Sequence, residues 1–198
     1  MSSAMLDDVR NYHTALRQAL DLLSLETVQR IAQEILATYD QQGRVFVFGN
    51  GGSAATASHM ACDVGKNTAI DGLPRLSICS LTDNTALITA LANDLGYDRI
   101  FAEQLVHAPV RRDDLVIAIS GSGNSPNVLA GIATATAVRA RTIGITGFGG
   151  GCLAPAVDVA LIVASECIEI VEDVHLMVNH AITTAVRAAL HARLAVAA

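Results

Sequence analysis

Aromatic residues are scarce in this chain. Phe, Trp and Tyr together make up 4% of its 198 residues, and Trp is absent. The hydrophobic share is nonetheless 52%, so the core must be built mainly from Ala, Val, Ile and Leu. Such a composition is typical of α/β proteins, in which helices cover both faces of a sheet. A chain of this length can bury a full core as one domain.

Positive charge is also in short supply. The chain has 13 Lys and Arg against 19 Asp and Glu, which gives a net charge of −6, and no stretch interleaves basic and aromatic residues. Both observations argue against a nucleic-acid surface. No apolar run reaches the roughly 18 residues that span a bilayer, and residues 1–8 (MSSAMLDD) are polar and acidic, unlike a signal peptide. We therefore expect a soluble cytoplasmic protein that binds neither nucleic acid nor membrane.

The four cysteines lack the paired spacing of a metal or redox motif. Cys62, Cys79, Cys152 and Cys167 form no CxxC pair, and two of them lie in or beside apolar runs. Thiols in the cytoplasm stay reduced, and a free cysteine behaves as a small hydrophobic residue. We expect four reduced, buried thiols.

Helical and strand patterns alternate along most of the chain. Apolar positions three and four residues apart predict two N-terminal helices, and later apolar runs alternate with helical segments. This alternation indicates a parallel sheet with right-handed crossovers. Within one domain we distinguish N-terminal helices, residues 1–42, from the sheet-containing part, residues 43–198. The expected helices are 5–22, 25–41, 53–66, 84–93, 98–107, 126–139 and 169–195, and the expected strands are 44–49, 75–80, 114–119, 141–146 and 158–164.

Two loops rich in glycine and serine follow predicted strands directly. Residues 49–53 read GNGGS after the apolar run 44–48, and residues 120–125 read SGSGNS after the run 115–119. Each loop would begin a helix, where free backbone N–H groups and the helix dipole favour an anion. Ligands of parallel sheets bind beyond the carboxyl ends of the strands, where both loops fall. One such loop is often only a tight connection, but two on one sheet indicate a site for a phosphorylated small molecule.

Neither loop matches a nucleotide-binding motif well. The Gly-Lys-Ser/Thr ending of a P-loop is missing from both. The first loop fits the dinucleotide-binding pattern only with Ala54 in the last position, and residues 77–80 (SICS) stand where an acidic residue would end the second strand.

A histidine and an acid follow the first loop on the same predicted helix. His59 and Asp63 are four residues apart and therefore share one helix face. Such a pair can bind a metal or move protons. It can equally be a helix-stabilising pair on a solvated face, and the pair alone does not decide between these readings.

The last predicted helix carries further acids and histidines. Glu172 and Asp173 both come within one broad stripe of His180, so helix geometry alone does not choose between the two acids. His175 points away from His180 and is expected to pack or to support other residues. Taken without further help, an acid and a His in such a helix are more often surface residues than ligands.

In their order and spacing, these motifs resemble the sugar isomerase (SIS) domain family, most closely its phosphoheptose isomerase branch. The resemblance covers nearly the whole chain and implies a flavodoxin-like, five-stranded parallel sheet flanked by helices, with N-terminal helices at an oligomer interface. It also implies a homotetramer with sites at subunit interfaces and a divalent metal, zinc. It rests on residues 49–53, His59 with Asp63, residues 92–94 (AND), residues 120–125, and Glu172 with His180.

The resemblance implies an aldose–ketose isomerase that converts sedoheptulose 7-phosphate to D-glycero-D-manno-heptose 7-phosphate by proton transfer through an enediol. Asp63 and His180 fall at the positions of the catalytic base and acid. The metal-ligand positions hold His59, Asp63, Glu172 and His180. The positions that contact the substrate or shape its pocket hold Ser53, Ser120, Ser122 and Ser125 for the phosphate, and Asn50, Gly51, Gly52, Asn93, Asp94, Gly121 and Glu172.

The chain departs from the family pattern at several positions. Asp63 stands where Glu is usual and is one methylene shorter, and Glu172 stands where Gln is usual and adds a negative charge. Gly121 replaces a frequent Thr, and the Asp of a later turn is replaced within residues 146–150 (TGFGG). These differences affect the expected substrate more than the expected reaction class.

Other readings of the same family stay open at this point. Some relatives of this branch bind protein partners, including the bacterial replication initiator, but lack the full set of acids and metal ligands. The presence of His59, Asp63 and His180 favours an enzyme. Domains of this family that sense sugar phosphates usually accompany a DNA-binding module, and none is found here. An isomerase of another phosphosugar is a further alternative, and the apolar stripes of the first two helices suit either an interface or the chain's own sheet.

Overall fold

A computed structural model describes residues 2–197, and their side chains from residue 4 to residue 195. Its centre is a five-stranded parallel sheet in the order β2-β1-β3-β4-β5, which confirms the expected flavodoxin-like arrangement. The strand order changes direction between β1 and β3, where such sheets bind their ligands. The strands are β1 (Val45–Gly49), β2 (Ile78–Ser80), β3 (Leu115–Ser120), β4 (Arg141–Thr146) and β5 (Val159–Ile162).

Residues 2–197 form seven α-helices, six of which pack on the sheet, and the expected helices and strands are found with small shifts at their ends. The predicted helix 53–66 divides into α3 and a π-helical turn, Asp63–Asn67, and α5 is preceded by a 3₁₀ turn, Tyr97–Arg99. The predicted strand 75–80 shortens to the three residues of β2. The helices are α1 (Ser2–Asp21), α2 (Leu25–Asp40), α3 (Gly52–Cys62), α4 (Thr85–Leu95), α5 (Ile100–His107), α6 (Pro126–Ala137) and α7 (Ile168–Ala197).

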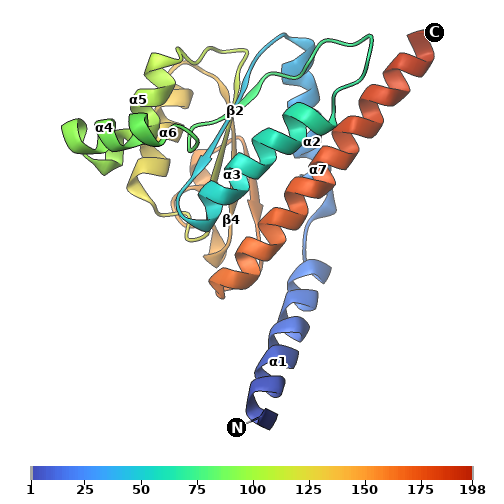
Figure 1. The fold of residues 1–198 in the computed structure, drawn as a ribbon, viewed down its shortest axis with the longest axis vertical. Coiled ribbons are helices and arrows are strands. Elements are labelled where there is room, and N and C mark those ends of the chain that lie inside the picture. The colour runs from blue at the N-terminus through green and yellow to red at the C-terminus, as the bar shows by residue number, and fades with distance from the viewer. Residues whose placement is uncertain (1, 198) are drawn as a thin grey trace.

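Alternation along the strands builds a core on each face of the sheet. In β1, Val45 and Val47 point into one core, and Phe46 and Phe48 point into the other. Helices α2, α3 and α7 cover the first face, and α4, α5 and α6 lie on the second (Figure 1). Three phenylalanines, Phe46, Phe48 and Phe101, lie in the second core, where the rings of Phe48 and Phe101 stack with centroids 4.7 Å apart.

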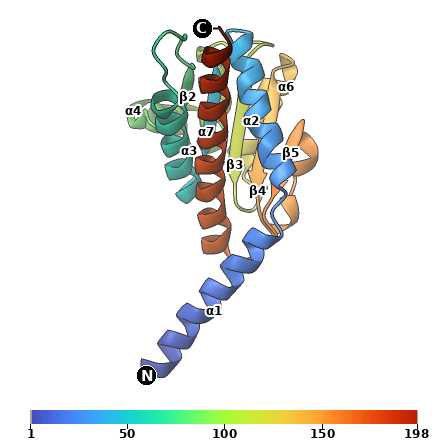
Figure 2. The same cartoon turned by 90° about the vertical axis from the view of Figure 1, so that its right-hand side faces the viewer.

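The two N-terminal helices differ in what they bury. Helix α2 packs against the sheet and α7, with Ile31 and Ile35 fully buried, so its apolar stripe covers the chain's own sheet. Helix α1 extends away from the body of the molecule (Figure 2), and its first half exposes Met5, Leu6 and Val9. The division at residue 42 stays a prediction. Within residues 2–197, no helix combines the length and apolar character needed to cross a membrane.

The prediction of buried thiols is wrong. Cys62, Cys79 and Cys152 are exposed and Cys167 is half-buried, although all four are free. Cys62 ends α3, Cys79 lies on the edge strand β2, and Cys152 lies in the turn region after β4. An apolar neighbourhood in the sequence did not place these side chains in the core, because each sits at an edge or an end of its element.

Candidate functional site

The two glycine- and serine-rich loops meet at the carboxyl edge of the sheet. Strands β1 and β3 pair in register, with Gly49 opposite Ile119, so the loops that follow them lie side by side. A cavity of about 200 Å³ opens between them, where α7 also begins. Its lining residues are Asn50, Ser53, Ser120, Gly121, Ser122, Ser125, Ile168 and Glu172.

Three helices begin at this cavity. Helix α3 starts at Gly52, α6 follows Ser125, and α7 starts at Ile168. Their N-terminal N–H groups and dipoles favour an anion, and serine hydroxyls add donors. A larger hollow of about 470 Å³ lies beside Tyr39 and Arg75, at the amino ends of β1 and β2. No helix begins among its lining residues, so the smaller cavity is the better anion site.

An amide pair ties the first loop to α6. Asn50 and Asn127 donate to each other's side-chain oxygens at 2.9 Å, and Asn127 is buried. The Tyr97 hydroxyl also donates to Asn50 Oδ1 at 3.0 Å. Sequence reasoning missed Asn127 and Tyr97, since an Asn in a first helical turn and a lone Tyr carry no local functional signal.

Two glycines of the loops make room for α7. A Cβ at Gly121 would lie 2.4 Å from Ile168 Cδ1, so any larger residue there would require the end of the Ile168 side chain to move. The carboxylate of Glu172 lies over Gly52, where a Cβ would come within 2.4 Å of Cδ. The first turns of α7 therefore pack directly on both loops.

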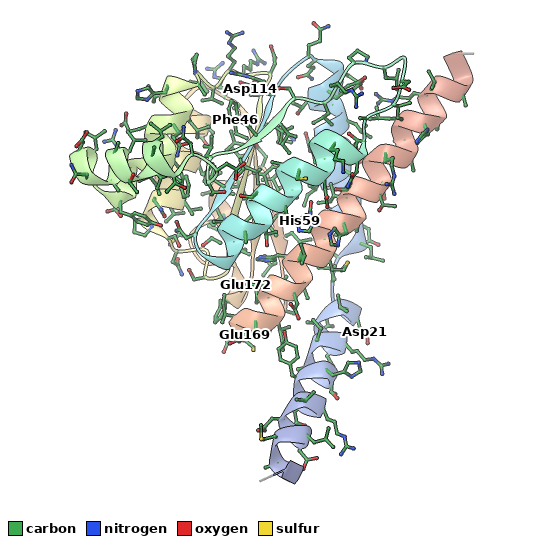
Figure 3. All side chains as sticks on the ribbon, viewed as in Figure 1. Asp21, Phe46, His59, Asp114, Glu169 and Glu172 are labelled. Atoms are coloured by element: carbon green, nitrogen blue, oxygen red, sulfur yellow. The ribbon has the colours of Figure 1, made fainter. Side chains whose placement is uncertain are left out.

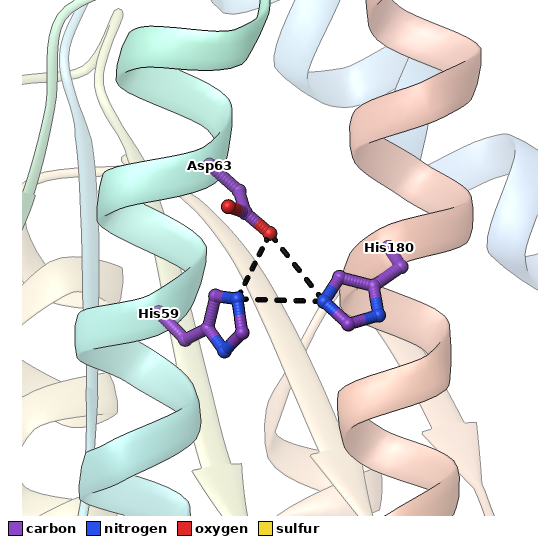
Figure 4. Close-up of side chains that lie close together, drawn as sticks. All are labelled: His59, Asp63 and His180. Carbon is purple, nitrogen blue, oxygen red and sulfur yellow. Dashed lines mark hydrogen bonds and ion pairs between the residues drawn. The ribbon is translucent and has the colours of Figure 1, made fainter.

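Two histidines and an acid converge farther along α3 and α7 (Figure 4). His59 Nε2 lies 3.2 Å and His180 Nε2 lies 3.6 Å from Asp63 Oδ2. The two Nε2 atoms are 3.4 Å apart. Both rings are partly exposed, whereas the side chain of Asp63 is 13% exposed. The cluster thus presents three ligand atoms toward one point and keeps an accessible side.

The spacing of these atoms fits a metal ion. Zn–N and Zn–O bonds of about 2.0–2.1 Å separate neighbouring tetrahedral ligands by about 3.3 Å. The three distances in the cluster bracket that value. Two imidazoles and one carboxylate also form a ligand set that zinc accepts, although mixed N/O ligation admits manganese, iron or nickel. The structure therefore supports a possible metal site at His59, Asp63 and His180.

Comparison with known proteins identifies the family of this chain. A family model described as the SIS domain matches residues 9–147. The chain belongs to the SIS domain family. A probable phosphoheptose isomerase from Thermoplasma acidophilum is 39% identical over 160 residues, which cover 81% of this chain and 87% of the relative. A phosphoheptose isomerase from Helicobacter pylori is 35% identical over 181 residues, 89% of this chain and 93% of the relative.

Solved structures agree with this assignment. The phosphoheptose isomerase from Neisseria gonorrhoeae superposes with a TM-score of 0.84 at 28% identity and covers 94% of this chain and 98% of its own. The enzyme from Francisella tularensis gives a TM-score of 0.85 at 28% identity, with coverage of 92% and 98%. This SIS domain thus shares its whole architecture with phosphoheptose isomerases.

The structure separates the acids that the sequence left undecided. Glu172 lies in the first turns of α7 (Figure 3) and lines the serine-loop cavity, outside the His–Asp–His group. Asp173 accepts a hydrogen bond from the Tyr12 hydroxyl at 2.7 Å, which links α1 to α7 and raises the pKa of Tyr12 to about 12. Of the four predicted metal ligands, the SIS domain brings His59, Asp63 and His180 together, and the metal role of Glu172 stays a prediction.

The remaining predicted residues divide into two groups. Gly51 belongs to the first loop, with φ +56°, a conformation that glycine adopts readily. Asn93 and Asp94 lie on α4, outside the residues that line the cavity, and Asn93 Nδ2 donates to Asp94 Oδ1 at 2.8 Å. Their expected substrate contacts stay predictions. His175 is buried as expected, and desolvation lowers its pKa to about 4, an effect that the backbone of Thr146 partly offsets.

Proposed function

We propose that this SIS-domain protein is a phosphoheptose isomerase that converts sedoheptulose 7-phosphate to D-glycero-D-manno-heptose 7-phosphate. One observation carries the proposal: the serine-loop cavity and the His–Asp–His cluster lie along the same two helices. On α3, His59 follows Ser53 by six residues, a rise of about 9 Å. On α7, His180 follows Glu172 by eight residues, a rise of about 12 Å.

These separations suit a sugar phosphate of this length. Three chain bonds span about 3.5 Å, so the six carbon–carbon bonds of a heptose reach about 7 Å and its phosphoester adds about 3 Å. A substrate anchored by its phosphate in the cavity would therefore present its first two carbons to the cluster. Phosphate binding then supplies energy remote from the reacting carbons.

The chemistry follows from the groups in the cluster. The Asp63 carboxylate takes a proton from C1, while His180 gives a proton to the oxygen on C2, which yields an enediol. Asp63 then returns a proton to C2, and the O1 hydroxyl gives its proton to His180 as the C1 aldehyde forms. His59, Asp63 and His180 would hold a divalent ion, which would supply Lewis-acid stabilisation of the negative charge that develops on the C2 oxygen before it is protonated. We propose zinc for this ion; Glu172, predicted from the family resemblance as a further ligand, lines the serine-loop cavity and lies outside this group.

The proposal extends to a homotetramer. The exposed apolar residues Met5, Leu6 and Val9 on the extended half of α1 support an interface between copies. The family resemblance points to the same assembly, with sites at subunit interfaces. Light scattering on the purified chain tests it, and a monomer at micromolar concentration would contradict it.

Turnover of sedoheptulose 7-phosphate, followed by NMR on protein of known metal content, tests the activity. Asp63→Asn is expected to abolish turnover without unfolding the chain, because the amide cannot accept the proton. Asp113→Asn is the matched control, since Asp113 is exposed and lies at the amino end of β3. Wild-type turnover in Asp63→Asn would exclude Asp63 as the base. A metal-replete tetramer without turnover would favour another phosphosugar or a partner-binding role.

A further inference from the structure

Amide donors reach both oxygens of the Asp63 carboxylate. Asn67 Nδ2 donates to Oδ1 at 3.0 Å, and Asn179 Nδ2 donates to Oδ2 at 3.3 Å. Oδ2 is also the oxygen that faces the imidazoles of His59 and His180. The two amides come from different elements, the π-helical turn after α3 and the middle of α7. Together they fix the plane of the carboxylate relative to the two rings.

Asn179 occupies an unfavourable place for an amide. Its side chain is fully buried in the interior of a long helix, and Oδ1 has no hydrogen-bond partner among the described residues. Asn is a weak helix former, and a buried amide oxygen without a partner is destabilising. Among the described residues, the Asn179 side chain donates its hydrogen bond to Asp63. A structural role alone therefore does not account for Asn at this position, whereas orientation of Asp63 does.

Asn67 lies four residues after Asp63, within reach of its carboxylate. Helix α3 ends at Cys62, and Asp63–Asn67 forms a π-helical turn. Such turns are rare in proteins, and those that occur are often found at functional sites. Within this turn the side chain of the last residue, Asn67, donates to the carboxylate of the first residue, Asp63. Asn67 is exposed, so its amide is free to hydrogen-bond with water and is not needed in the core.

We propose that Asn179 and Asn67 are positioning residues that hold Asp63 with Oδ2 directed between His59 and His180. Asp63 is one methylene shorter than the Glu expected from the family pattern, so its reach depends more strongly on its orientation. Holding the carboxylate in place prepares Oδ2 for metal binding and for proton transfer. The proton-transfer part rests on the proposed function, whereas the metal part rests on the cluster itself.

The test is Zn²⁺ affinity, measured on the metal-free full-length chain by competition with a chromophoric chelator. Asn179→Leu removes the donor together with the unpartnered oxygen at nearly constant size, so the fold is expected to survive. We expect its Kd for Zn²⁺ to rise at least about tenfold, as for other residues that orient metal ligands. Thr183→Val is the matched control: Thr183 lies one turn further on α7, is buried, and has an unpartnered hydroxyl. Its Kd should change less than about twofold.

Asn67→Ala keeps the proposal testable if Asn179→Leu fails to fold, because Asn67 is exposed. Its Kd for Zn²⁺ should rise several-fold, and the visible spectrum of the Co²⁺-loaded protein should change in both asparagine variants and not in Thr183→Val. Wild-type Zn²⁺ affinity in the folded asparagine variants would overturn the proposal, as would a wild-type chain that binds no Zn²⁺. Loss of affinity in the variants, together with a wild-type chain that does not turn over sedoheptulose 7-phosphate, would refute the isomerase proposal alone.

Discussion

His175 should make the stability of this protein depend on pH between about 4 and 6.5. His175 is 1% exposed, and the backbone of Thr146 only partly offsets the effect of burial on its pKa. Burial lowers the pKa of His175 to about 4, from 6.5 in the unfolded chain. Between these values the unfolded state binds more protons, so the free energy of unfolding falls as pH falls. The free energy of unfolding therefore has its full value, as far as His175 is concerned, above pH 6.5, and it decreases as the pH falls toward 4.

The size of the effect follows from the same two pKa values. Full protonation corresponds to a loss of about 3 kcal/mol, and about 2 kcal/mol of that loss is reached by pH 5. His175→Leu removes the titrating group and replaces the buried ring with an apolar side chain. Between pH 7.5 and pH 5, the wild type should therefore lose about 2 kcal/mol more unfolding free energy than the variant.

Urea unfolding of both chains at the two pH values measures this difference. One protein concentration is used throughout, because the stability of an oligomer depends on concentration. All other titrating groups are common to both chains and cancel in the comparison. Parallel losses in wild type and His175→Leu, with equal m-values, would refute the assignment of this pH dependence to His175.

Two further substitutions test the scaffold around the site. Asp114→Asn should lower the free energy of unfolding, measured with urea, by about 3 kcal/mol. The substitution leaves Arg44 without the buried carboxylate that its guanidinium contacts at 2.7 Å. A loss below about 1 kcal/mol would contradict this prediction. Gly123→Ala should lower the unfolding free energy by at least about 2 kcal/mol and weaken phosphate binding, because Gly123 has φ +66° and a Cβ would lie 2.2 Å from the Gly150 carbonyl oxygen. Wild-type melting and phosphate affinity in Gly123→Ala would count against the role of this loop as a rigid anion site.

The strands and the two loops were predictable because their signals are local, whereas the strand order was expected only from the family resemblance. Apolar runs followed by GNGGS and SGSGNS mark where β1 and β3 end, and pairing of those strands is enough to bring the loops together. The His59–Asp63 spacing likewise needs only one helix. The meeting with His180 is different, since it depends on α7 packing against α3, and the family pattern rather than helix geometry anticipated it.

Other parts of the site depend on contacts that no local pattern encodes. The position of Glu172 over Gly52 follows from how the first turns of α7 dock on the loops. The pairing of Asn50 with Asn127 joins residues 77 positions apart, and the bond from Asn179 to Asp63 joins residues 116 positions apart. The π-helical turn Asp63–Asn67 also has no signal in a helical periodicity of 3.6 residues.

The central claim is proton transfer between two carbons of a heptose phosphate. Its most direct test is incubation of the metal-loaded protein with sedoheptulose 7-phosphate in D₂O, followed by NMR. An isomerase that works through an enediol should produce the manno-heptose 7-phosphate. The product should carry deuterium at C2 in every turnover in which the proton on Asp63 exchanges with solvent before it returns to the substrate. Unchanged substrate without deuterium at C1, from a folded and metal-replete oligomer, would contradict the claim.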